Sequence, residues 1–366
     1  MSFNFYMPVN VISGKDCVSA NPKIFALGKK ALIVTGKNSA KISGALDDVT
    51  AVLASLDIGY IIFDRITENP LAQMCHDGGK ICRDEGCDFI VAIGGGSPID
   101  GAKAISAYAA DASIAVADIF TKGTEVACLP VIAIPTTAGT GSETNPYSVL
   151  TLPGGDVKKT FKSPTSFPKH ALIDAKYTMS LNENYTVSCA LDALAHAIES
   201  YLSPKASIQS ELLAMWAAKT VWDVIFCGNT SEFTYADREK LIYASSAAGM
   251  AINQTGTGFP HPLGYSITLL DGVPHGRACG AFEGKYLEYN ERTEAGKAKL
   301  ETLYRHLNTT GDEMKRRIPE KANVTLSLSD AQIEEYVNRV SDAGNYSNSP
   351  YIISKTEMIE IYRSLF

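Results

Sequence analysis

The chain has 366 residues, of which 45% are hydrophobic and 20% are charged, and its formal net charge is −7. This length exceeds the roughly 250 to 300 residues at which a single hydrophobic core stops growing, so two domains are expected. The net negative charge argues against the broad basic surface with which proteins gather nucleic acid or anionic lipid.

The N-terminal segment and the cysteines indicate the cellular compartment. The first residues lack the basic stretch and the long apolar stretch of a secretory signal, and no run of about 18 apolar residues occurs in the sequence. The eight cysteines form no C-x-x-C pair, which suits reduced thiols. We therefore expect a cytoplasmic protein with neither a membrane segment nor a nucleic-acid partner.

The first half alternates short, apolar, β-branched runs with amphipathic segments. Continuous Val, Ile and Ala runs suit strands that are covered on both faces, as in a doubly wound parallel sheet. A Pro-Gly-Gly turn between two strand-like runs predicts a hairpin within 145–163. The sequence therefore predicts an α/β domain over 1–180. Its expected strands lie within 29–36, 59–66, 87–94, 129–135 and 170–175, with a helix near 45–57.

The second half repeats apolar residues with helical spacing, and β-branched runs become rare. We expect an all-helical domain over 181–366. Because no long linker separates the two halves, the boundary near 176–184 is expected to be a tight joint with a cleft.

A glycine-rich loop, Gly94-Gly95-Gly96-Ser97-Pro98-Ile99-Asp100, follows the predicted strand at 87–94. Ser97 is expected to cap the next helix, Pro98 to occupy its first position and Asp100 to complete a capping box. Free N–H groups at such a helix start can bind an anion. The alternative is a well-capped turn with nothing bound.

A second polar loop spans Pro135 to Glu143 after the run LPVIAI, and seven of its nine residues are small or hydroxylated. At the carboxyl edge of a doubly wound sheet, such a loop can hydrogen-bond a ribose or a pyrophosphate. An ordinary turn rich in Thr and Gly is the alternative reading.

Three of the six histidines stand in suggestive surroundings in the helical half. Asp192 and His196 are four residues apart on one predicted helix and share a face, with Glu199 one turn further on. His261 stands between prolines, and His275 lies in a loop-like stretch rich in Gly and Pro. One carboxylate with three imidazoles suits Fe²⁺ or Zn²⁺, although each histidine taken singly is more simply an ordinary hydrogen-bonded side chain. Glu199 is expected to orient a ligand imidazole.

Together the motifs GGGSPID, PTTAGTGSE and DALAHAIESYLS with the two later histidines resemble the iron-containing (group III) alcohol dehydrogenase family across nearly the whole chain. The resemblance implies a Rossmann-like dinucleotide domain, a helical metal domain, a site in the cleft between them, and a homodimer. It implies hydride transfer between NADP(H) or NAD(H) and a small primary alcohol, diol or aldehyde at Fe²⁺, or at Zn²⁺ as the alternative. By resemblance, catalysis runs through a metal held by Asp192, His196, His261 and His275. The implied cofactor contacts are Asn69, Gly95, Gly96, Ser97, Asp100, Thr136, Thr137, Thr140, Ser142, and Lys158 or Lys159.

Two positions depart from the pattern of that family. Many NAD-using relatives carry an Asp after the first Rossmann strand, where this chain has Gly36 followed by Lys37, Asn38 and Ser39. No carboxylate there repels a 2′-phosphate, so Gly36 and Ser39 join the expected cofactor contacts and NADP is favoured over NAD. Some relatives also carry a further histidine where this chain has Tyr265, so a proton relay would use Tyr265, the ribose hydroxyl or water.

Two other functions compete with the dehydrogenase reading. A metal- and NAD-dependent lyase resembling dehydroquinate synthase would share the architecture, but the basic pattern that binds its phosphate substrate is not evident. A dinucleotide sensor without turnover would need a broken metal set, whereas all four expected ligand positions are intact.

Overall fold

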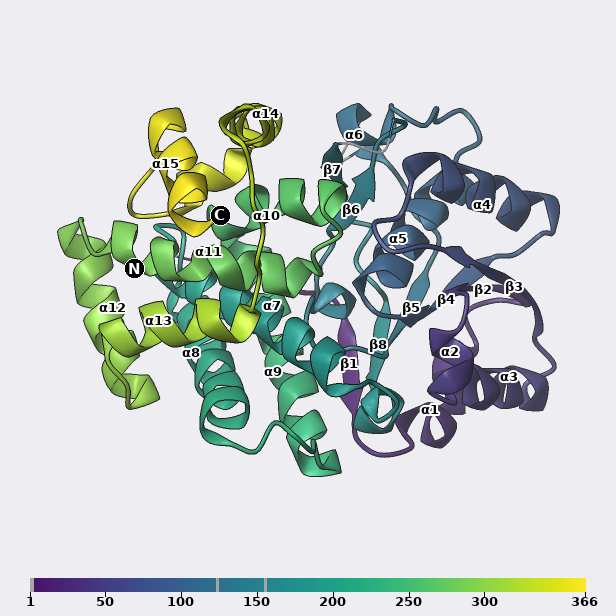
Figure 1. Cartoon of the computed structure of the whole chain (residues 1–366). Helices are drawn as coiled ribbons and strands as arrows, with labels where there is room; N and C mark the ends of the chain where they lie inside the picture. The colour runs from purple at the N-terminus through teal and green to yellow at the C-terminus, as the bar shows by residue number, and fades with distance from the viewer. Residues whose placement is uncertain (1–2, 123–124, 155–156) are drawn as a thin grey trace. The chain divides into compact units, whose positions relative to one another are not determined.

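The computed structural model describes residues 3–122, 125–154 and 157–366, which form two compact units (Figure 1). One unit is Met7–Leu181, and the other combines the N-terminal residues as far as Tyr6 with Asn182–Phe366. The first unit is α/β and the second is helical, which confirms the predicted fold class. Over the described ranges, no helix combines the length and the apolar character needed to cross a bilayer.

The α/β unit is built on a six-stranded sheet in the order β1-β8-β5-β4-β2-β3, in which all pairings are parallel. Its strands are β1 (Asn10–Ser13), β2 (Lys30–Gly36), β3 (Gly59–Ile66), β4 (Phe89–Gly94), β5 (Val131–Pro135) and β8 (His170–Ile173). The predicted hairpin is present as the antiparallel pair β6 (Ser148–Thr151) and β7 (Lys158–Phe161). Residues 155–156 of its turn lie outside the described residues.

Helices cover both faces of this sheet, as continuous apolar strands require. The helices of this unit are α1 (Cys17–Ala20), α2 (Ser39–Ile42), α3 (Ala45–Ser55), α4 (Ala72–Asp84), α5 (Gly96–Ala110) and α6 (Ile119–Lys122), with the 3-10 helices η1 (Pro22–Phe25), η3 (Ser142–Thr144) and η4 (Ala175–Thr178). Side chains alternate along β2, so that Leu32 and Val34 pack with α4 and α5, whereas Ala31 and Ile33 pack with α1 and α3.

The strand order reverses between β2 and β4, because β3 lies on one side of β2 and the later strands lie on the other. Thr35 pairs with Ile93 and Gly94 pairs with Pro135, so β2, β4 and β5 end level at the carboxyl edge of the sheet. Doubly wound sheets bind ligands at such a reversal. The two predicted polar loops therefore start side by side at the expected position.

The helices of the helical unit are α7 (Glu183–Leu202), α8 (Ile208–Trp222), α9 (Tyr235–Thr255), α10 (Pro260–Leu270), α11 (His275–Asn290), α12 (Glu294–Leu307), α13 (Gly311–Ala322), α14 (Asp330–Val340) and α15 (Lys355–Leu365), with the π-helical turn η5 (Asp223–Cys227) and the 3-10 helix η6 (Gly344–Asn348). Helix α7 packs against α8, α9 and α11, and α11 also packs against α10 and α13. Helix α7 is buried around most of its circumference, which is typical of the central helix of a helical core.

Four local expectations were wrong. Helix α5 begins at Gly96 after Gly95, with no side-chain cap, so Ser97 lies inside the first turn and is not the cap, and Pro98 is the third helical residue and not the first. Asp100 completes no capping box, because its carboxylate accepts hydrogen bonds from Ser142 Oγ and from the Val149 backbone N–H. His275 is the first residue of α11 and does not lie in a loop.

Candidate metal centre and cofactor loops

Helix α7 places Asp192 and His196 on one buried face. Asn182 caps the helix by accepting a hydrogen bond from the Tyr185 N–H, which fixes where its turns begin. Four residues apart, Asp192 Oδ1 and His196 Nε2 lie 3.8 Å from each other, and both side chains are buried. The spacing predicted from the sequence therefore produces the expected proximity.

His261 and His275 reach the same carboxylate from the first turns of α10 and α11. Their Nε2 atoms lie 3.6 Å and 3.7 Å from Asp192 Oδ1. The His261 ring stacks on His196 at 4.5 Å between ring centroids and meets His275 edge-on at 5.4 Å. Three imidazoles from three helices thus converge on one oxygen atom.

The separations of these donor atoms fit a metal ion. Donors about 2.0–2.2 Å from a tetrahedral ion lie about 3.3–3.6 Å from one another, close to the distances from Asp192 Oδ1 to the three rings. Asp192 Oδ1 and His261 Nε2 are also buried without a hydrogen-bond partner. Unsatisfied buried polar atoms are costly, and a divalent cation would give both atoms a partner.

The charges within the cluster keep Asp192 ionised and His261 protonated while no ion is bound. Burial alone would raise the pKa of Asp192, but His196, His275 and His261 hold it well below its ordinary value. Burial would lower the pKa of His261, but Cys279, Glu199 and Asp192 raise it well above its ordinary value. An ion that binds His261 Nε2 must therefore displace a proton, as is usual for metal binding.

Glu199 makes the contact expected of it. Its carboxylate oxygens lie 2.8 Å and 2.9 Å from His261 Nδ1, and it also accepts the Gly258 backbone N–H. A hydrogen bond from Nδ1–H fixes the tautomer and leaves Nε2 directed at the other donors. Burial raises the pKa of Glu199, and the hydrogen bonds from His261 and Gly258 oppose that rise.

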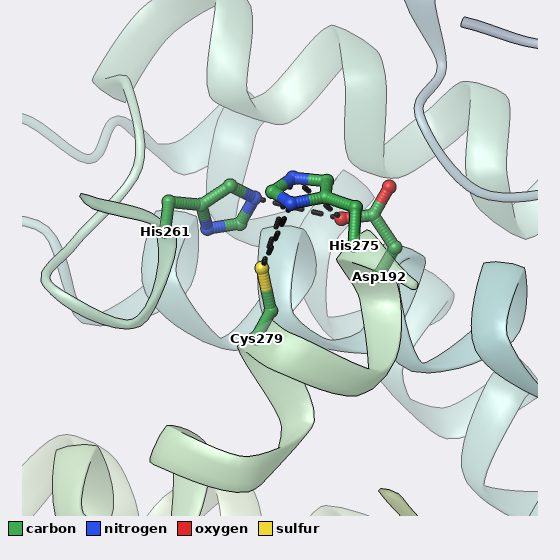
Figure 2. Close-up of side chains that lie close together, drawn as sticks. All are labelled: Asp192, His261, His275 and Cys279. Carbon is green, nitrogen blue, oxygen red and sulfur yellow. Dashed lines mark hydrogen bonds and ion pairs between the residues drawn. The ribbon is translucent and has the colours of Figure 1, made fainter. Parts of the chain in front are cut away.

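Cys279 was missed in the sequence. It lies one turn after His275 on α11, and its Sγ is 3.8 Å from His275 Nε2. One donor atom from each of Asp192, His261, His275 and Cys279 lies within 4.8 Å of the others, and Figure 2 shows these four side chains pointing toward one another. Burial raises the pKa of the Cys279 thiol to about 11, against the opposing effect of His261. The signal was a helical H-x-x-x-C spacing, hidden by the expectation of a loop at His275.

Tyr265 lies on α10, and its ring stacks on His275 at 5.8 Å between ring centroids. Burial raises the pKa of the phenol to about 12, so it keeps its proton at neutral pH. A neutral phenol beside this cluster can donate a hydrogen bond to a substrate oxygen.

In the α/β unit, the two polar loops touch each other closely. A Cβ added to Gly95 would lie 2.9 Å from Thr137 Oγ1, and one added to Gly96 would lie 2.6 Å from Thr140 Cγ2. Both glycines are therefore needed for the second loop to pack on the first, whether or not a phosphate also approaches. The Thr136 N–H donates to the Gly94 carbonyl at 2.9 Å and joins the loops at their base.

Asp100 and Ser142 are brought together, and a lysine that sequence reasoning missed connects them. Lys103 Nζ donates to Ser142 Oγ and to the Tyr147 carbonyl, both at 2.7 Å, and lies 3.7 Å from Asp100 Oδ1. The Lys103 side chain is completely buried, and burial lowers its pKa to about 8. Asp100 and Ser142 therefore hold the loops together with contacts inside the protein.

The remaining predicted cofactor residues lie around the same edge of the sheet. Gly36 ends β2 and Ser39 begins α2, where it is exposed. Asn69 follows β3 with a positive φ of 55°, and its carbonyl accepts a hydrogen bond from Thr151 of the hairpin. Lys158 and Lys159 begin β7 of that hairpin.

Comparison with known proteins follows the same division of the chain. Residues 8–175 match the family described as iron-containing alcohol dehydrogenase, and residues 186–366 match the C-terminal domain of that family. The chain is 33% identical over 298 residues to a 1,3-propanediol dehydrogenase from Citrobacter freundii, covering 78% of this chain and 73% of that protein. It is 27% identical over 387 residues to an NADPH-dependent butanol dehydrogenase from Clostridium saccharobutylicum, covering 99% and 97%. A crystal structure of an iron-containing alcohol dehydrogenase from Thermotoga maritima superposes with a TM-score of 0.91 at 35% identity, covering 100% and 99%.

Proposed function

The chain belongs to the iron-containing alcohol dehydrogenase family and is an NAD(P)-dependent oxidoreductase, and we propose that it reduces small aldehydes with NADPH and oxidises the matching primary alcohols or diols. The observation that carries this proposal is the convergence of His196, His261 and His275 on Asp192 Oδ1, within 3.8 Å. We propose these four side chains as the ligands of the metal.

A divalent ion held by these ligands would act as a Lewis acid toward the oxygen of an alcohol or aldehyde. The residues of the chain prepare that chemistry. Glu199 keeps the Nδ1 proton of His261 in place, so that the Nε2 lone pair faces the ligand cluster. Tyr265 beside His275 has a protonated phenol that can donate to the substrate oxygen, and we propose it as the first group of the proton relay.

The preference for NADPH is proposed from the end of β2. Gly36 carries no carboxylate, and Lys37 and Ser39 are exposed immediately after it. A cation and a hydroxyl in this position suit a 2′-phosphate. We propose that the cofactor pyrophosphate binds at the start of α5, where the N–H groups of Gly96 and Ser97 precede the intrahelical hydrogen bonds and a helix dipole lies behind them.

The test uses protein stripped with a chelator and reloaded anaerobically with Fe²⁺ or Zn²⁺, assayed for NADPH and NADH oxidation with a panel of short aldehydes. Metal-restored turnover that prefers NADPH is expected. Absence of turnover with every metal would contradict the proposal and favour a lyase or a non-catalytic dinucleotide sensor.

Removal of a ligand tests whether metal binding and cofactor binding are independent. His261→Ala is expected to lose metal and turnover while it keeps NADPH binding, because the cofactor loops belong to the other unit. NADPH binding is measured by isothermal titration and metal content by mass spectrometry. Full activity in metal-free His261→Ala protein would refute the role of the metal.

Substitution at the end of β2 tests the choice of cofactor. Gly36→Asp is expected to shift the NADPH to NADH ratio of kcat/KM by about tenfold or more toward NADH, because a carboxylate would face the 2′-phosphate. The φ of Gly36 is not positive, but a Cβ there would lie 3.3 Å from the Ile66 carbonyl oxygen, so that backbone must shift slightly, and circular dichroism is used to establish that the variant is folded. An unchanged ratio would contradict this placement of the phosphate.

The compartment and the assembly are also proposed. We propose the cytoplasm as the compartment, because none of the eight cysteines, all of which the structure describes, is joined in a disulfide, and we propose a homodimer as the assembly.

A further inference from the structure

We propose that Cys82 and Cys87 form a redox pair, in which a peroxide oxidises Cys87 and Cys82 then closes a reversible disulfide with it. The pair lies in the α/β unit, where Cys82 is in the last turn of α4 and Cys87 comes two residues before β4. The inference does not depend on the proposed function, because these cysteines lie near the amino end of β4, whereas the glycine-rich cofactor loop leaves its carboxyl end.

The end of α4 brings the two cysteines together. The Cys87 N–H donates to the Cys82 carbonyl at 2.9 Å, and the Gly86 N–H donates to the Arg83 carbonyl at 2.9 Å. With the positive φ of 66° at Gly86, these two bonds form a Schellman motif. In this motif the residue after the left-handed glycine contacts the side chain five positions earlier, usually as an apolar pair. Both positions are cysteines here, so the turn places two thiols side by side.

The contacts of the two side chains support this placement. Cys82 Sγ lies 3.8 Å from the Cys87 carbonyl oxygen, and the two thiols share a hydrogen bond. Both side chains are buried in the same hydrophobic cluster. A disulfide requires two adjacent backbones, and the hydrogen bond from the Cys87 N–H to the Cys82 carbonyl already holds them together.

The surroundings give the two thiols different reactivity. The hydrogen bond from Cys82 and the cation of Lys30 lower the pKa of Cys87, against the effects of burial, Glu85 and Asp88. The hydrogen bond with Cys87 and burial raise the pKa of Cys82. The thiolate is the nucleophilic form, and Cys87 keeps 8% of its surface exposed whereas Cys82 keeps none. Cys87 is therefore the thiol that meets an oxidant first.

The reaction balances with hydrogen peroxide as the oxidant. The Cys87 thiolate attacks one peroxide oxygen, the O–O bond breaks, and the sulfur becomes a sulfenic acid while the leaving hydroxide takes up a proton to form water. The Cys82 sulfur then attacks the Cys87 sulfur, the S–S bond forms, and the sulfenic hydroxyl leaves with the Cys82 proton as a second water. A small dithiol reverses the oxidation by thiol–disulfide exchange. Disulfides of this transient kind are the ones that reducing compartments allow.

The experiment treats the folded, Zn²⁺-loaded protein with hydrogen peroxide, alkylates the remaining thiols and maps the peptides by mass spectrometry. Zn²⁺ is used because it has no redox chemistry with peroxide. Trypsin cuts after Lys80, Arg83 and Lys103, so the disulfide would join peptides 81–83 and 84–103. We expect this linked pair to form with peroxide and to disappear with dithiothreitol. Its absence, with Cys87 unreacted or converted to a sulfinic acid, would overturn the proposal.

Substitutions test the role of each thiol. Cys82→Ser is expected to lose the linked peptides and to accumulate a Cys87 sulfenic acid that dimedone traps, whereas Cys87→Ser is expected to lose both products. Cys75→Ser is the matched control, because Cys75 is an equally buried cysteine of α4, and it is expected to leave the linked peptides unchanged. Dimedone labelling of Cys82 in the Cys87→Ser protein would overturn the assigned roles. If a variant does not fold, the peptide map of the unsubstituted protein decides.

Discussion

Glu199 allows the metal site to be perturbed without touching a ligand. Its carboxylate lies 2.8 Å from His261 Nδ1 and also accepts the Gly258 N–H, and the side chain is completely buried. Glu199→Ala removes both acceptors and leaves two buried donors unpaired. The imidazole then loses the contact that fixes its tautomer and its direction.

The expected size follows from that geometry. Loss of a partner that orients a ligand histidine typically weakens metal affinity about 10- to 100-fold, which corresponds to about 1.4–2.7 kcal/mol. Two unpaired buried donors lower folding stability by a further 1–3 kcal/mol each, roughly. Glu199→Gln keeps an acceptor oxygen and should lie between Glu199→Ala and the unsubstituted protein in both quantities.

The assay is competition for Zn²⁺ against a chromophoric chelator, with circular dichroism to establish that each variant is folded. Glu183→Gln is the matched control, because Glu183 is an exposed acid in the first turn of the same helix. A folded Glu199→Ala protein with unchanged zinc affinity would refute the reasoning, since it would show that His261 needs no orienting partner.

Three further predictions concern the α/β unit. Lys103→Met should destabilise this unit by about 3–5 kcal/mol in urea titrations, because it leaves the largely buried Asp100 without its cation. The double variant Lys103→Met/Asp100→Asn should recover part of the loss, and equal stability of the single and double variants would contradict the role of the Lys103–Asp100 pair. Because the pKa of Lys103 is lowered in the folded protein, the unfolded chain binds more protons than the folded one between pH 8 and 10.5. The free energy of unfolding should therefore rise with pH across that window, by up to about 3 kcal/mol. The Lys103→Met protein should lack this rise. Gly96→Ala should lower the free energy of unfolding by about 1–3 kcal/mol, because the added Cβ would collide with Thr140. The double variant Gly96→Ala/Thr140→Ala should restore most of that loss in the same titration. If it restores none, the contact with Thr140 is not the cause of the destabilisation.

Periodicity in the sequence was sufficient to predict the strands and the core of the helical half. Alternate residues of the run ALIVT in β2 lie on opposite faces of the sheet, and helices cover both faces, as the continuous apolar residues of this run predict. The proximity of Asp192 and His196 was equally predictable, because residues that are four apart on a helix lie on the same face.

Tertiary contacts determine three features that the local sequence patterns did not predict. Asp100 stands where a capping box would place an acid, yet its carboxylate bonds Ser142 and Val149, more than forty residues later in the chain. The position of Lys103 in an apolar helix did not indicate its hydrogen-bond partners, Ser142 and Tyr147, which lie in the segment after β5. His275 sits among residues typical of loops, but Pro274 ends the turn and α11 starts at once, which aligns Cys279 one turn below it.

The proposed ligands span α7, α10 and α11, so they join points that lie more than sixty residues apart in the chain. An ion bound to all of them acts as a removable crosslink within the helical unit. At a hundredfold excess over its Kd, a ligand that binds only the folded form stabilises that form by about 2.7 kcal/mol. Helices α8 and α9 lie in the segment that this crosslink closes, and the entropy of closing a loop grows only slowly with its length. Insertions between α8 and α9 should therefore be tolerated while the ion is bound. They should lower the folding stability of the helical unit most when metal is scarce. The supply of metal would then influence how freely this part of the sequence can change.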